Sequence, residues 1–448
     1  MMEAKKENAP AGGNPGAGRR KDDNSSLQKS GDLSSEEIRL EAEAAAEAER
    51  VEHRPRLRSF EPWSFSAYKA KGPAPARQWL VNNTIAMRGV TILAAFGDAG
   101  KSLLALDLAK KVGDPNKGGF FNPSMAFGNE VSQTGTALLV TSEDDVDEVH
   151  RRLESLNYKG YEDAYVMPLP DAGGPAPLVV PGNNGPEASP AWYEFLEEIR
   201  RFNNLKMVNF DPLANFVMAD INADPAVGAF TMGLFGSLAA ETGAAIMTNH
   251  HLGKTLQNIK TPEQARQMIR GSTAIVDGAR GAYALWGVGE EKEAKNICLA
   301  LDVEYRPNRI FKGAVVKSNG PADRGVKIYV RNDNGLLEVR NDQLQQASAA
   351  SNDLSLDTLA NDIAAAAERG FPFTRTGQMG VYEKRESLSQ SIRSLSRDKL
   401  LSLLDTLIDE GRVRRCRAKG STVEKWLDVR GGQFWNGEGD FSQGADDV

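Results

Sequence analysis

Residues Ala95–Ser102, with the sequence AFGDAGKS, combine the residue types that bind phosphate groups. Small residues let backbone N–H groups approach phosphate oxygens, and the positive N-terminal end of a following helix attracts the same anion. Lys101 would reach the β- and γ-phosphates of a nucleotide, and the Ser102 hydroxyl would ligate Mg²⁺. Ala95 replaces the usual first glycine, which is tolerable where its φ is negative. We therefore predict an ATP and Mg²⁺ site, whose nucleotide-binding residues are Gly97, Asp98, Ala99, Gly100, Lys101, Ser102 and Leu103.

Two acidic residues are candidates for binding Mg²⁺ and for orienting the attacking water. Asp211 ends the apolar run Met207–Phe210 and is the candidate second ligand of Mg²⁺. A proline and a leucine follow it, which excludes the adjacent pair of acids that is common in AAA+ ATPases. Glu143 ends another strand pattern, Thr136–Ser142, and is the candidate base that orients the attacking water. The alternative for Glu143 is a solvated residue that caps the end of the strand.

His250 and His251 are adjacent at the end of a third strand pattern, Ala244–Thr248. A histidine in this place can hydrogen-bond the γ-phosphate and report its hydrolysis to the loop that follows. Metal binding by both histidines is unfavourable because adjacent strand residues point in opposite directions. Ordinary polar packing is the remaining alternative.

The elements that must position these residues alternate between strands and helices. The first strand pattern is Val90–Ala95, and near-continuous apolar strands of this kind predict a parallel sheet covered on both faces. The expected helices are Ser102–Val112, Val146–Leu156, Trp192–Phe202 and Phe230–Thr242. Further strands, some of them antiparallel, are expected at Ala282–Trp286, Ile297–Leu301, Ala314–Lys317 and Lys327–Arg331.

Taken together and in order, the motifs between Trp79 and Val339 resemble the RepA-like branch of the RecA/DnaB ring ATPases, known from plasmid and phage replication. The matching segments are Thr141–Asp145, Arg151–Leu153, Asp211–Leu213, Asn249–Lys254 and Arg270–Arg280. The resemblance implies a RecA-type P-loop core of the α/β class and catalysis by Glu143. It also implies a γ-phosphate sensor, with His251 preferred to His250.

Ring ATPases of this type place ATP between subunits, where an arginine or lysine of the neighbour completes each site. By resemblance, one candidate for this trans-acting group is Arg280, and the other is the pair Lys317 and Arg324. Such a group stabilises charge in the transition state and is worth about 10³ or more in rate. The alternative for each residue is a surface salt bridge.

Two segments follow the strands that carry Asp211 and His251, namely Phe216–Ala226 and Gly253–Arg270. In this fold they emerge at the carboxyl edge of the sheet, where ligands bind, and the resemblance places them along a central channel. The second segment carries four cations that would contact DNA phosphates without reading sequence: Lys254, Lys260, Arg266 and Arg270. The alternative is a solvated loop.

Composition divides the chain into five parts. Residues 1–58 contain hardly any aromatic side chain and are expected to form a disordered tether, ahead of an ATPase core at 59–342. A polar linker is expected at 343–356. Residues 357–430 show three helical stretches and two short strands, the layout of a winged-helix-like domain, and 431–448 form an acidic tail expected to be disordered.

Within the core, the Pro/Gly/Asn-rich excursion Pro168–Pro190 is either a functional loop or a disordered insertion. The whole chain has a net charge of -7, which argues against a protein that is basic all over but leaves room for a local basic surface. No run of about 18 apolar residues predicts a membrane span. The chain starts without the apolar stretch of a signal peptide, and Cys298 and Cys416 form no metal-ligand spacing. We therefore expect a cytoplasmic protein without a membrane partner.

The leading expectation is an ATP-dependent DNA helicase of phage or plasmid replication. It would be a DNA-stimulated ATPase that acts on single-stranded DNA as a homo-oligomeric ring, a hexamer by resemblance. Its C-terminal domain would be available to replication proteins or to DNA. Two alternatives remain: a RecA-fold regulatory or loader ATPase without unwinding activity, and a DNA-binding replication initiator.

Overall fold

The structure is a computed structural model that describes residues 59–116, 123–253, 258–271, 273–417 and 421–435. The chain divides into two compact units, Met1–Pro75 and Ala76–Val448. The described part of the first unit contains a short 3-10 helix, η1 (Glu61–Trp63), and helix α2 (Phe65–Ala70). The predicted tether, residues 1–58, lies outside the described residues.

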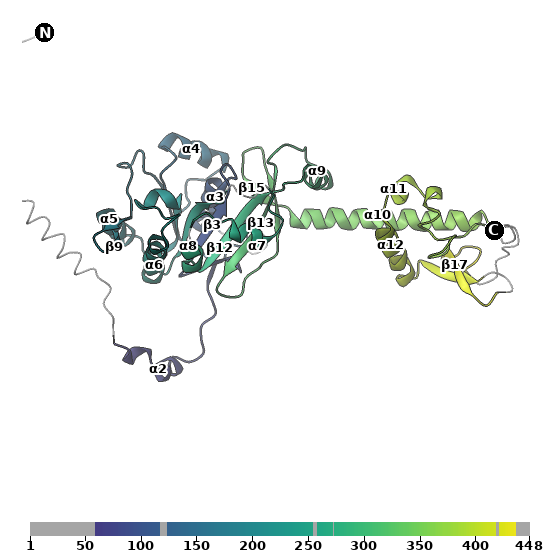
Figure 1. The fold of residues 1–448 in the computed structure, drawn as a ribbon, viewed down its shortest axis with the longest axis horizontal. Coiled ribbons are helices and arrows are strands. Elements are labelled where there is room, and N and C mark those ends of the chain that lie inside the picture. The colour runs from purple at the N-terminus through teal and green to yellow at the C-terminus, as the bar shows by residue number, and fades with distance from the viewer. Residues whose placement is uncertain (1–58, 117–122, 254–257, 272, 418–420, 436–448) are drawn as a thin grey trace, which may run out of the picture. The chain divides into compact units, whose positions relative to one another are not determined.

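The second unit is built around a mixed β-sheet. Its strands are β3 (Val90–Ala95), β6 (Thr136–Thr141), β7 (Ala164–Pro168), β10 (Leu205–Asp211), β11 (Ala245–His251), β12 (Gly281–Gly287), β13 (Ile310–Ser318), β14 (Lys327–Arg331) and β15 (Leu337–Val339). Within the described residues these nine strands lie in the order β15-β14-β13-β12-β3-β11-β10-β6-β7. Figure 1 labels β3, β12, β13 and β15 of this sheet. The strands from β12 to β7 run parallel, and β13, β14 and β15 are antiparallel. The predicted parallel sheet with an antiparallel extension is confirmed.

Helices cover both faces of this sheet. They are α3 (Lys101–Gly113), α4 (Val146–Ser155), α5 (Pro190–Ile199), η2 (Leu213–Phe216), α6 (Pro225–Thr242), α7 (Pro262–Gln267), α8 (Thr273–Gly278) and α9 (Glu291–Ala300). Alternate strand residues pack on opposite sides, because successive side chains of a strand point to opposite faces. One core contains Leu104 and Leu108 of α3, and the other contains Trp192 of α5, Phe235 of α6 and Ile275 of α8. The mixed α/β architecture with a mainly parallel sheet is consistent with the predicted P-loop NTPase core.

Three short antiparallel pairs accompany the sheet: β1 (Trp79–Val81) with β2 (Ile85–Ala86), β4 (Met125–Ala126) with β5 (Asn129–Glu130), and β8 (Val179–Gly182) with β9 (Gly185–Ala188). The last pair lies within the excursion 168–190. Its strands are tied to the segment after β10, since Met218 N–H donates to Val179 O at 2.8 Å and Leu178 N–H donates to Phe216 O at 2.8 Å. The excursion is therefore an ordered hairpin, and its interpretation as a disordered insertion is wrong.

The predicted strand Ile297–Leu301 is also wrong, because these residues lie at the end of helix α9. Ala294, Ile297 and Cys298 recur at helical spacing and are buried together on one face. On the exposed side, Lys295 and Glu291 form an i,i+4 ion pair of 2.6 Å that supports the helix. A short apolar run does not distinguish a strand from one buried helix face.

The C-terminal part begins with a long helix, α10 (Asn341–Glu368). The predicted linker, residues 343–356, is helical and forms part of α10, because it is rich in Ala, Gln and Leu and contains neither Gly nor Pro. The helix is followed by η3 (Arg385–Ser387), α11 (Gln390–Arg393), α12 (Arg397–Asp409) and the antiparallel pair β16 (Val413–Arg417) and β17 (Glu424–Val429).

This C-terminal part has a core of its own, to which the leucine stripe of α12 contributes Leu400, Leu404 and Leu407. The predicted tail, 431–448, is described only as far as residue 435. Within it Phe434 is 2% exposed and clusters with Ala367 and Cys416, so the first residues of the predicted tail belong to the folded domain. No helix among the described residues is long and apolar enough to span a bilayer.

The aromatic cluster beneath β10 yields a stability prediction. The rings of Phe210 and Phe235 stack at 4.6 Å between centroids, and Phe235 is fully buried. We expect Phe235→Ala to lower the free energy of unfolding by about 3–5 kcal/mol, because the neighbours of a buried ring close the cavity only partly. Phe65→Ala, at a ring that is 92% exposed, should change it by no more than about 0.5 kcal/mol. Urea titrations of the two full-length variants measure both values, and equal destabilisation would contradict this packing.

Candidate active site

The phosphate loop connects the end of β3 to the start of α3, as predicted. Gly100 caps the helix with φ 88°, and Asp98 also has a positive φ of 57°, a conformation that Gly and Asp adopt more readily than most residues. Ala95 is the last residue of β3, is fully buried and has no positive φ. Alanine therefore occupies the place of the usual first glycine without backbone strain.

Lys101 lies against the loop that it follows. Its side chain is buried, and its Nζ donates to the carbonyl oxygens of Phe96 at 2.9 Å and Ala95 at 3.3 Å. Burial lowers the pKa of Lys101, whereas the nearby charges of Asp211, Glu143 and Asp98 raise it. The structure thus brings the phosphate-loop lysine and both predicted catalytic carboxylates together.

Asp211 ends β10 beside Thr141 at the end of β6. Its carboxylate is buried, and burial raises the pKa of Asp211, while the neighbouring polar groups of Ser102 and Asn249 and the charge of Lys101 lower it. Ser102 and Asp211 supply the hard oxygen donors that Mg²⁺ prefers, and phosphate oxygens usually complete such a site. Among the described residues, no group of three His, Cys, Asp or Glu side chains could hold a metal alone. The residues present therefore fit Mg²⁺ bound together with a nucleotide.

Glu143 and Asp144 follow β6 and differ in their surroundings. Asp144 pairs with Arg152 of α4; burial raises the pKa of Asp144 and Arg152 lowers it. Glu143 is exposed, lies within electrostatic reach of Lys101, and makes no ion pair within the described ranges. Of the two acids, Glu143 is thus the one free to orient a water molecule beside a bound phosphate.

The two histidines at the end of β11 lie on opposite faces of the sheet. His251 pairs in register with Ala95 and faces the phosphate loop; burial lowers the pKa of His251, as do the charges of Lys101 and Arg270, and Asp211 raises it. His250 is buried on the other face, where its Nε2 lies 2.6 Å from Arg270 O. Burial lowers the pKa of His250 to about 4, so its ring is neutral and Nε2 donates to that carbonyl. The geometry therefore favours His251 over His250 as a phosphate sensor.

The predicted trans-acting residues lie at the opposite edge of the sheet from the phosphate loop. Arg280 precedes β12, and its N–H donates to Val90 O at the start of β3. Val90 and Ala95 are five residues apart, or roughly 16 Å along the strand. Lys317 and Arg324 lie at the same edge or just beyond it, because Ser318 at the end of β13 pairs with Gly281 at the start of β12.

The cations predicted to bind DNA do not form one group. Arg270 has an exposed side chain. Its backbone N–H donates to His251 O, and its backbone carbonyl accepts from His250 Nε2. Arg266 lies 3.5 Å from Asp277 and electrostatically close to Lys317, among the predicted trans-acting residues. Lys254 lies outside the described residues.

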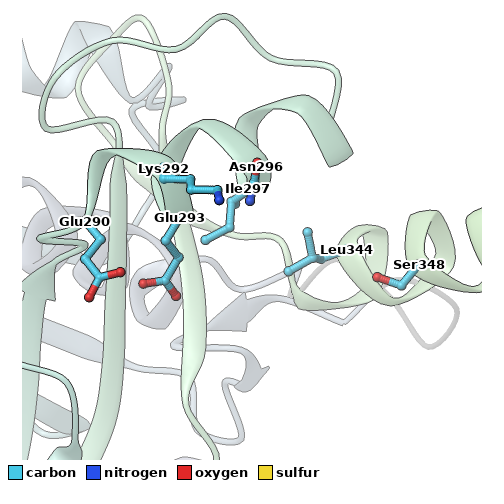
Figure 2. A pocket seen from close by; sticks show the side chains of 7 residues that line it. All are labelled: Glu290, Lys292, Glu293, Asn296, Ile297, Leu344 and Ser348. Carbon is cyan, nitrogen blue, oxygen red and sulfur yellow. The ribbon is translucent and has the colours of Figure 1, made fainter. Parts of the chain in front are cut away.

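Lys260 is paired with Glu290 at 2.9 Å. Glu290 lines a pocket of about 370 Å³ between α9 and the first turns of α10, where Glu293, Ile297 and Leu344 also lie (Figure 2). Glu293 has a cation of its own, since Lys312 lies 2.6 Å away. The charge of Lys260 is therefore already compensated within the chain.

Two residues near the phosphate loop and Asp211 were given no role of their own from the sequence. Asn249 is fully buried and lies two positions before His251, so the same alternation places both on the nucleotide face. Arg331, at the end of β14, donates through Nη2 to Asp98 O at 2.6 Å and lies over the ring of Phe311 at 5.0 Å. Burial lowers the pKa of Arg331, and Asp98 raises it. Only strand alternation could have identified Asn249, and no local signal marks Arg331, which is 233 residues from its partner.

Comparison with known families supports the nucleotide site. Residues 52–257 match the model of the AAA_25 family, described as an AAA domain, a family of P-loop ATPases that includes RecA-like and helicase-like members. The match contains the phosphate loop, Glu143, Asp211 and His251, and ends before Arg280. No curated protein matches the chain. The match supports an AAA-type P-loop ATPase domain over residues 52–257 and implies nucleotide binding, usually with Mg²⁺.

We expect Lys101→Ala to abolish ATP hydrolysis, because the buried ammonium is the group positioned to neutralise the terminal phosphates. Steady-state phosphate release by the purified variant measures this. Lys110→Ala, at the other end of the same helix, is the control and should retain turnover. Hydrolysis near the wild-type rate by Lys101→Ala would remove the basis of the assignment.

Glu143→Gln should bind ATP nearly as tightly as the wild-type protein but hydrolyse it more slowly by about two to four orders of magnitude, as expected when a positioned base is lost. A fluorescent ATP analogue measures binding, and single-turnover assays measure hydrolysis. Asp147→Asn on α4 removes a nearby exposed carboxylate as the control and should have little effect. Normal hydrolysis by Glu143→Gln would mean that another acid is the base.

Proposed function

We propose that this protein is an ATP-dependent DNA helicase of phage or plasmid replication, a ring of identical subunits that moves along single-stranded DNA. The observation that carries the proposal is the position of Arg280 and Arg324. Both are exposed, and they lie at the opposite edge of the sheet from the phosphate loop of the same chain. Neither can reach its own nucleotide site, whereas a neighbouring subunit could receive either one, as in ring ATPases that share their sites.

The contacts of Lys317 narrow the choice of trans-acting residue. Its Nζ donates to three carbonyl oxygens at the end of α8, those of Val276 and Ala279 at 2.6 Å and of Asp277 at 2.8 Å. An ammonium group has three donors, and all three are used within the chain. We therefore assign the trans-acting role to Arg280 or Arg324 and a helix-capping role to Lys317.

The link between the histidines and the next segment supports a motor. Arg270 N–H donates to His251 O at 3.0 Å, and Arg270 O accepts from His250. A shift of His251 on loss of the γ-phosphate would move Arg270, one of the cations predicted to contact DNA. Its neighbour Gly271 lies against Asn222 of the segment after β10, the other predicted channel segment. Both segments could thus respond to one nucleotide.

We also propose that the C-terminal part is a winged-helix domain. Thr374 pairs with Trp426 of β17, and Leu427 N–H donates to Phe373 O at 2.8 Å. The β16–β17 hairpin therefore has a third, short strand segment, which comes from the chain between α10 and η3. Three helices packed on such a small sheet are the expected layout of this domain class, which serves DNA or partner replication proteins.

Two other functions fit parts of the same geometry. A regulatory or loader ATPase would hydrolyse ATP in response to DNA without separating strands, so a forked duplex with a labelled strand distinguishes it from a helicase. A replication initiator would retain one DNA sequence at high salt through its C-terminal domain. The exposed arginines distant from the phosphate loop favour the shared-site motor over both alternatives.

A mixing experiment tests the shared site. Arg280→Ala and Lys101→Ala should each be inactive alone. The Arg280 variant should hydrolyse ATP about 10³-fold more slowly than the wild-type protein. In mixed oligomers some interfaces combine an intact Lys101 with an intact Arg280, so part of the ATPase activity should return. Mixing Lys101→Ala with Glu143→Gln is the control and should restore nothing, because both groups belong to the same side of the site.

If the first mixture stays inactive while a fluorescence assay shows that subunits exchange, Arg280 is not the trans-acting residue. The same mixture made with Arg324→Ala then decides whether Arg324 has this role. If neither mixture regains ATPase activity, the proposal of a shared site is overturned. A strictly monomeric protein in the presence of an ATP analogue and single-stranded DNA would overturn the ring.

A further inference from the structure

The β14–β15 hairpin packs against the phosphate loop of the same chain. A Cβ placed on Gly100 would lie 3.7 Å from Gly335 O, in the turn between the two strands, and 3.8 Å from a side-chain carbon of Leu337. Leu337 is 4% exposed and belongs to the same hydrophobic core as Ala99 of the loop. The hairpin lies outside residues 52–257, which match the family model, so the match gives it no role.

Arg331, the last residue of β14, makes a polar contact between the hairpin and the loop. Its Nη2 donates to Asp98 O at 2.6 Å. The guanidinium lies 5.0 Å from the ring centroid of Phe311, which is 5% exposed, and the backbone N–H of Arg331 donates to Arg309 O at 2.8 Å. The backbone and the side chain of Arg331 are therefore both held in place, and its donor meets the loop at one carbonyl.

The accepting carbonyl belongs to the peptide group between Asp98 and Ala99. This peptide is trans, so its C=O and N–H bonds point in opposite directions. A bond that holds Asp98 O toward the hairpin therefore turns Ala99 N–H away from the hairpin. Rotation of this one peptide group would reverse both directions.

Ala99 N–H lacks an acceptor within the chain. Ala99 is 2% exposed, and in the part of the chain that the structure describes no group accepts a hydrogen bond from its N–H. A buried N–H without an acceptor is costly. In phosphate loops the backbone N–H groups cradle the α- and β-phosphates of the nucleotide. A phosphate oxygen is thus the acceptor that this N–H requires.

The backbone of Asp98 needs a restraint. Its φ is 57°, in the left-handed region that a residue with a Cβ adopts at a cost. Such a conformation persists only where the surroundings hold it. A return of Asp98 to negative φ would redirect the peptide group that follows it, together with Ala99 N–H. The bond from Arg331 opposes this change.

The other surroundings of Arg331 do not require a guanidinium. Its Nε is buried and has no hydrogen-bond partner among the described residues, which is unfavourable for stability. A methionine would have no unpaired donor and adapts to irregular apolar space such as that over Phe311. The hairpin is also held at a second point, because Asn334 Nδ2 donates to Ser155 O at the end of α4 at 3.2 Å. The contact with Asp98 is therefore what an arginine adds here.

We propose that Arg331 is a positioning residue of the nucleotide site: its bond to Asp98 O directs Ala99 N–H toward the β-phosphate of a bound nucleotide. It acts on the loop of its own chain, unlike the trans-acting arginines. The inference goes beyond the proposed function and rests only on nucleotide binding, whether or not the protein forms a ring or unwinds DNA. Because the β-phosphate contact exists before and during the chemical step, loss of Arg331 weakens binding more than it slows hydrolysis.

The test compares Arg331→Met with the wild-type protein in the absence of DNA. A fluorescent ADP and a fluorescent, non-hydrolysable ATP analogue are titrated in the presence of Mg²⁺, and steady-state hydrolysis of ATP gives kcat and KM. We expect both dissociation constants and KM to rise about 10- to 100-fold, the range for a hydrogen bond to a charged group. We expect kcat to stay within about 2-fold of the wild-type value.

Two further variants at the same position separate the hydrogen bond from packing. Arg331→Lys should recover part of the affinity, because an ammonium group can also donate to Asp98 O. Arg331→Gln is too short to reach Asp98 O and should lose as much affinity as Arg331→Met, so the test does not depend on the folding of one variant. Thermal unfolding of each protein shows that it is folded.

Arg306→Met is the matched control. Arg306 pairs with Asp333 in the turn of the same hairpin at 3.3 Å and with Glu304 at 2.7 Å, and its loss should leave both dissociation constants unchanged. Unchanged dissociation constants in folded Arg331→Met or Arg331→Gln would overturn the proposal, and so would a fall in kcat without weaker binding. A loss confined to the ATP analogue would also overturn it, because Arg331 would then contact the γ-phosphate itself. None of these measurements involves unwinding, so failure here is distinct from failure of the proposed function.

Discussion

The structure depends on one electrostatic constraint, the burial of Lys101 and Asp211 in the same compartment at the carboxyl edge of the sheet. A buried ion without partners is costly, so each one must be hydrogen-bonded. The phosphate-loop carbonyls accept from the ammonium group, while Ser102 and Asn249 lie beside the carboxylate. The two buried ions and their neighbours come from β3, α3, β10 and β11, which is why the central parallel strands cannot shift register without breaking the site. A nucleotide with Mg²⁺ would replace weak internal contacts by strong ones to phosphate and metal.

Because the parallel strands all run in the same direction, the residues of the nucleotide site and the proposed trans-acting arginines lie at opposite edges of the sheet. Groups that follow strands, such as Glu143 and His251, gather at one edge, and groups that precede β12 or follow the antiparallel β13, such as Arg280 and Arg324, gather at the other. One chain thus presents a nearly complete nucleotide site at one edge and exposed arginines at the opposite edge. This arrangement suits the proposed head-to-tail association, in which unlike surfaces meet and a ring forms where the rotation between subunits closes.

Much of the fold and of the nucleotide site could be predicted from the sequence, because most of the residues involved lie close together along the chain. The phosphate loop and the strand that ends at Asp211 are contiguous segments, and strand alternation decides between His250 and His251. Contacts between distant segments were beyond such reasoning: Arg331 meets the phosphate loop across 233 residues, and Lys317 is fixed by carbonyls at the end of α8. The helix at 291–300 was missed because its apolar residues are few and close together. The ordered hairpin at 179–188 was missed because its Pro- and Gly-rich sequence resembles a loop.

The end of β11 shows how a single strand can couple the two faces of the sheet. His251 faces the phosphate loop, and His250 lies on the other face of the sheet and hydrogen-bonds Arg270 O. Because the two residues share a planar peptide group, a displacement of the backbone at His251 also acts on His250. Arg270 hydrogen-bonds at both points, through its N–H to His251 and through its carbonyl to His250, so it cannot follow one histidine alone. In the proposed motor, a change at the γ-phosphate would therefore reach Arg270 through both hydrogen bonds.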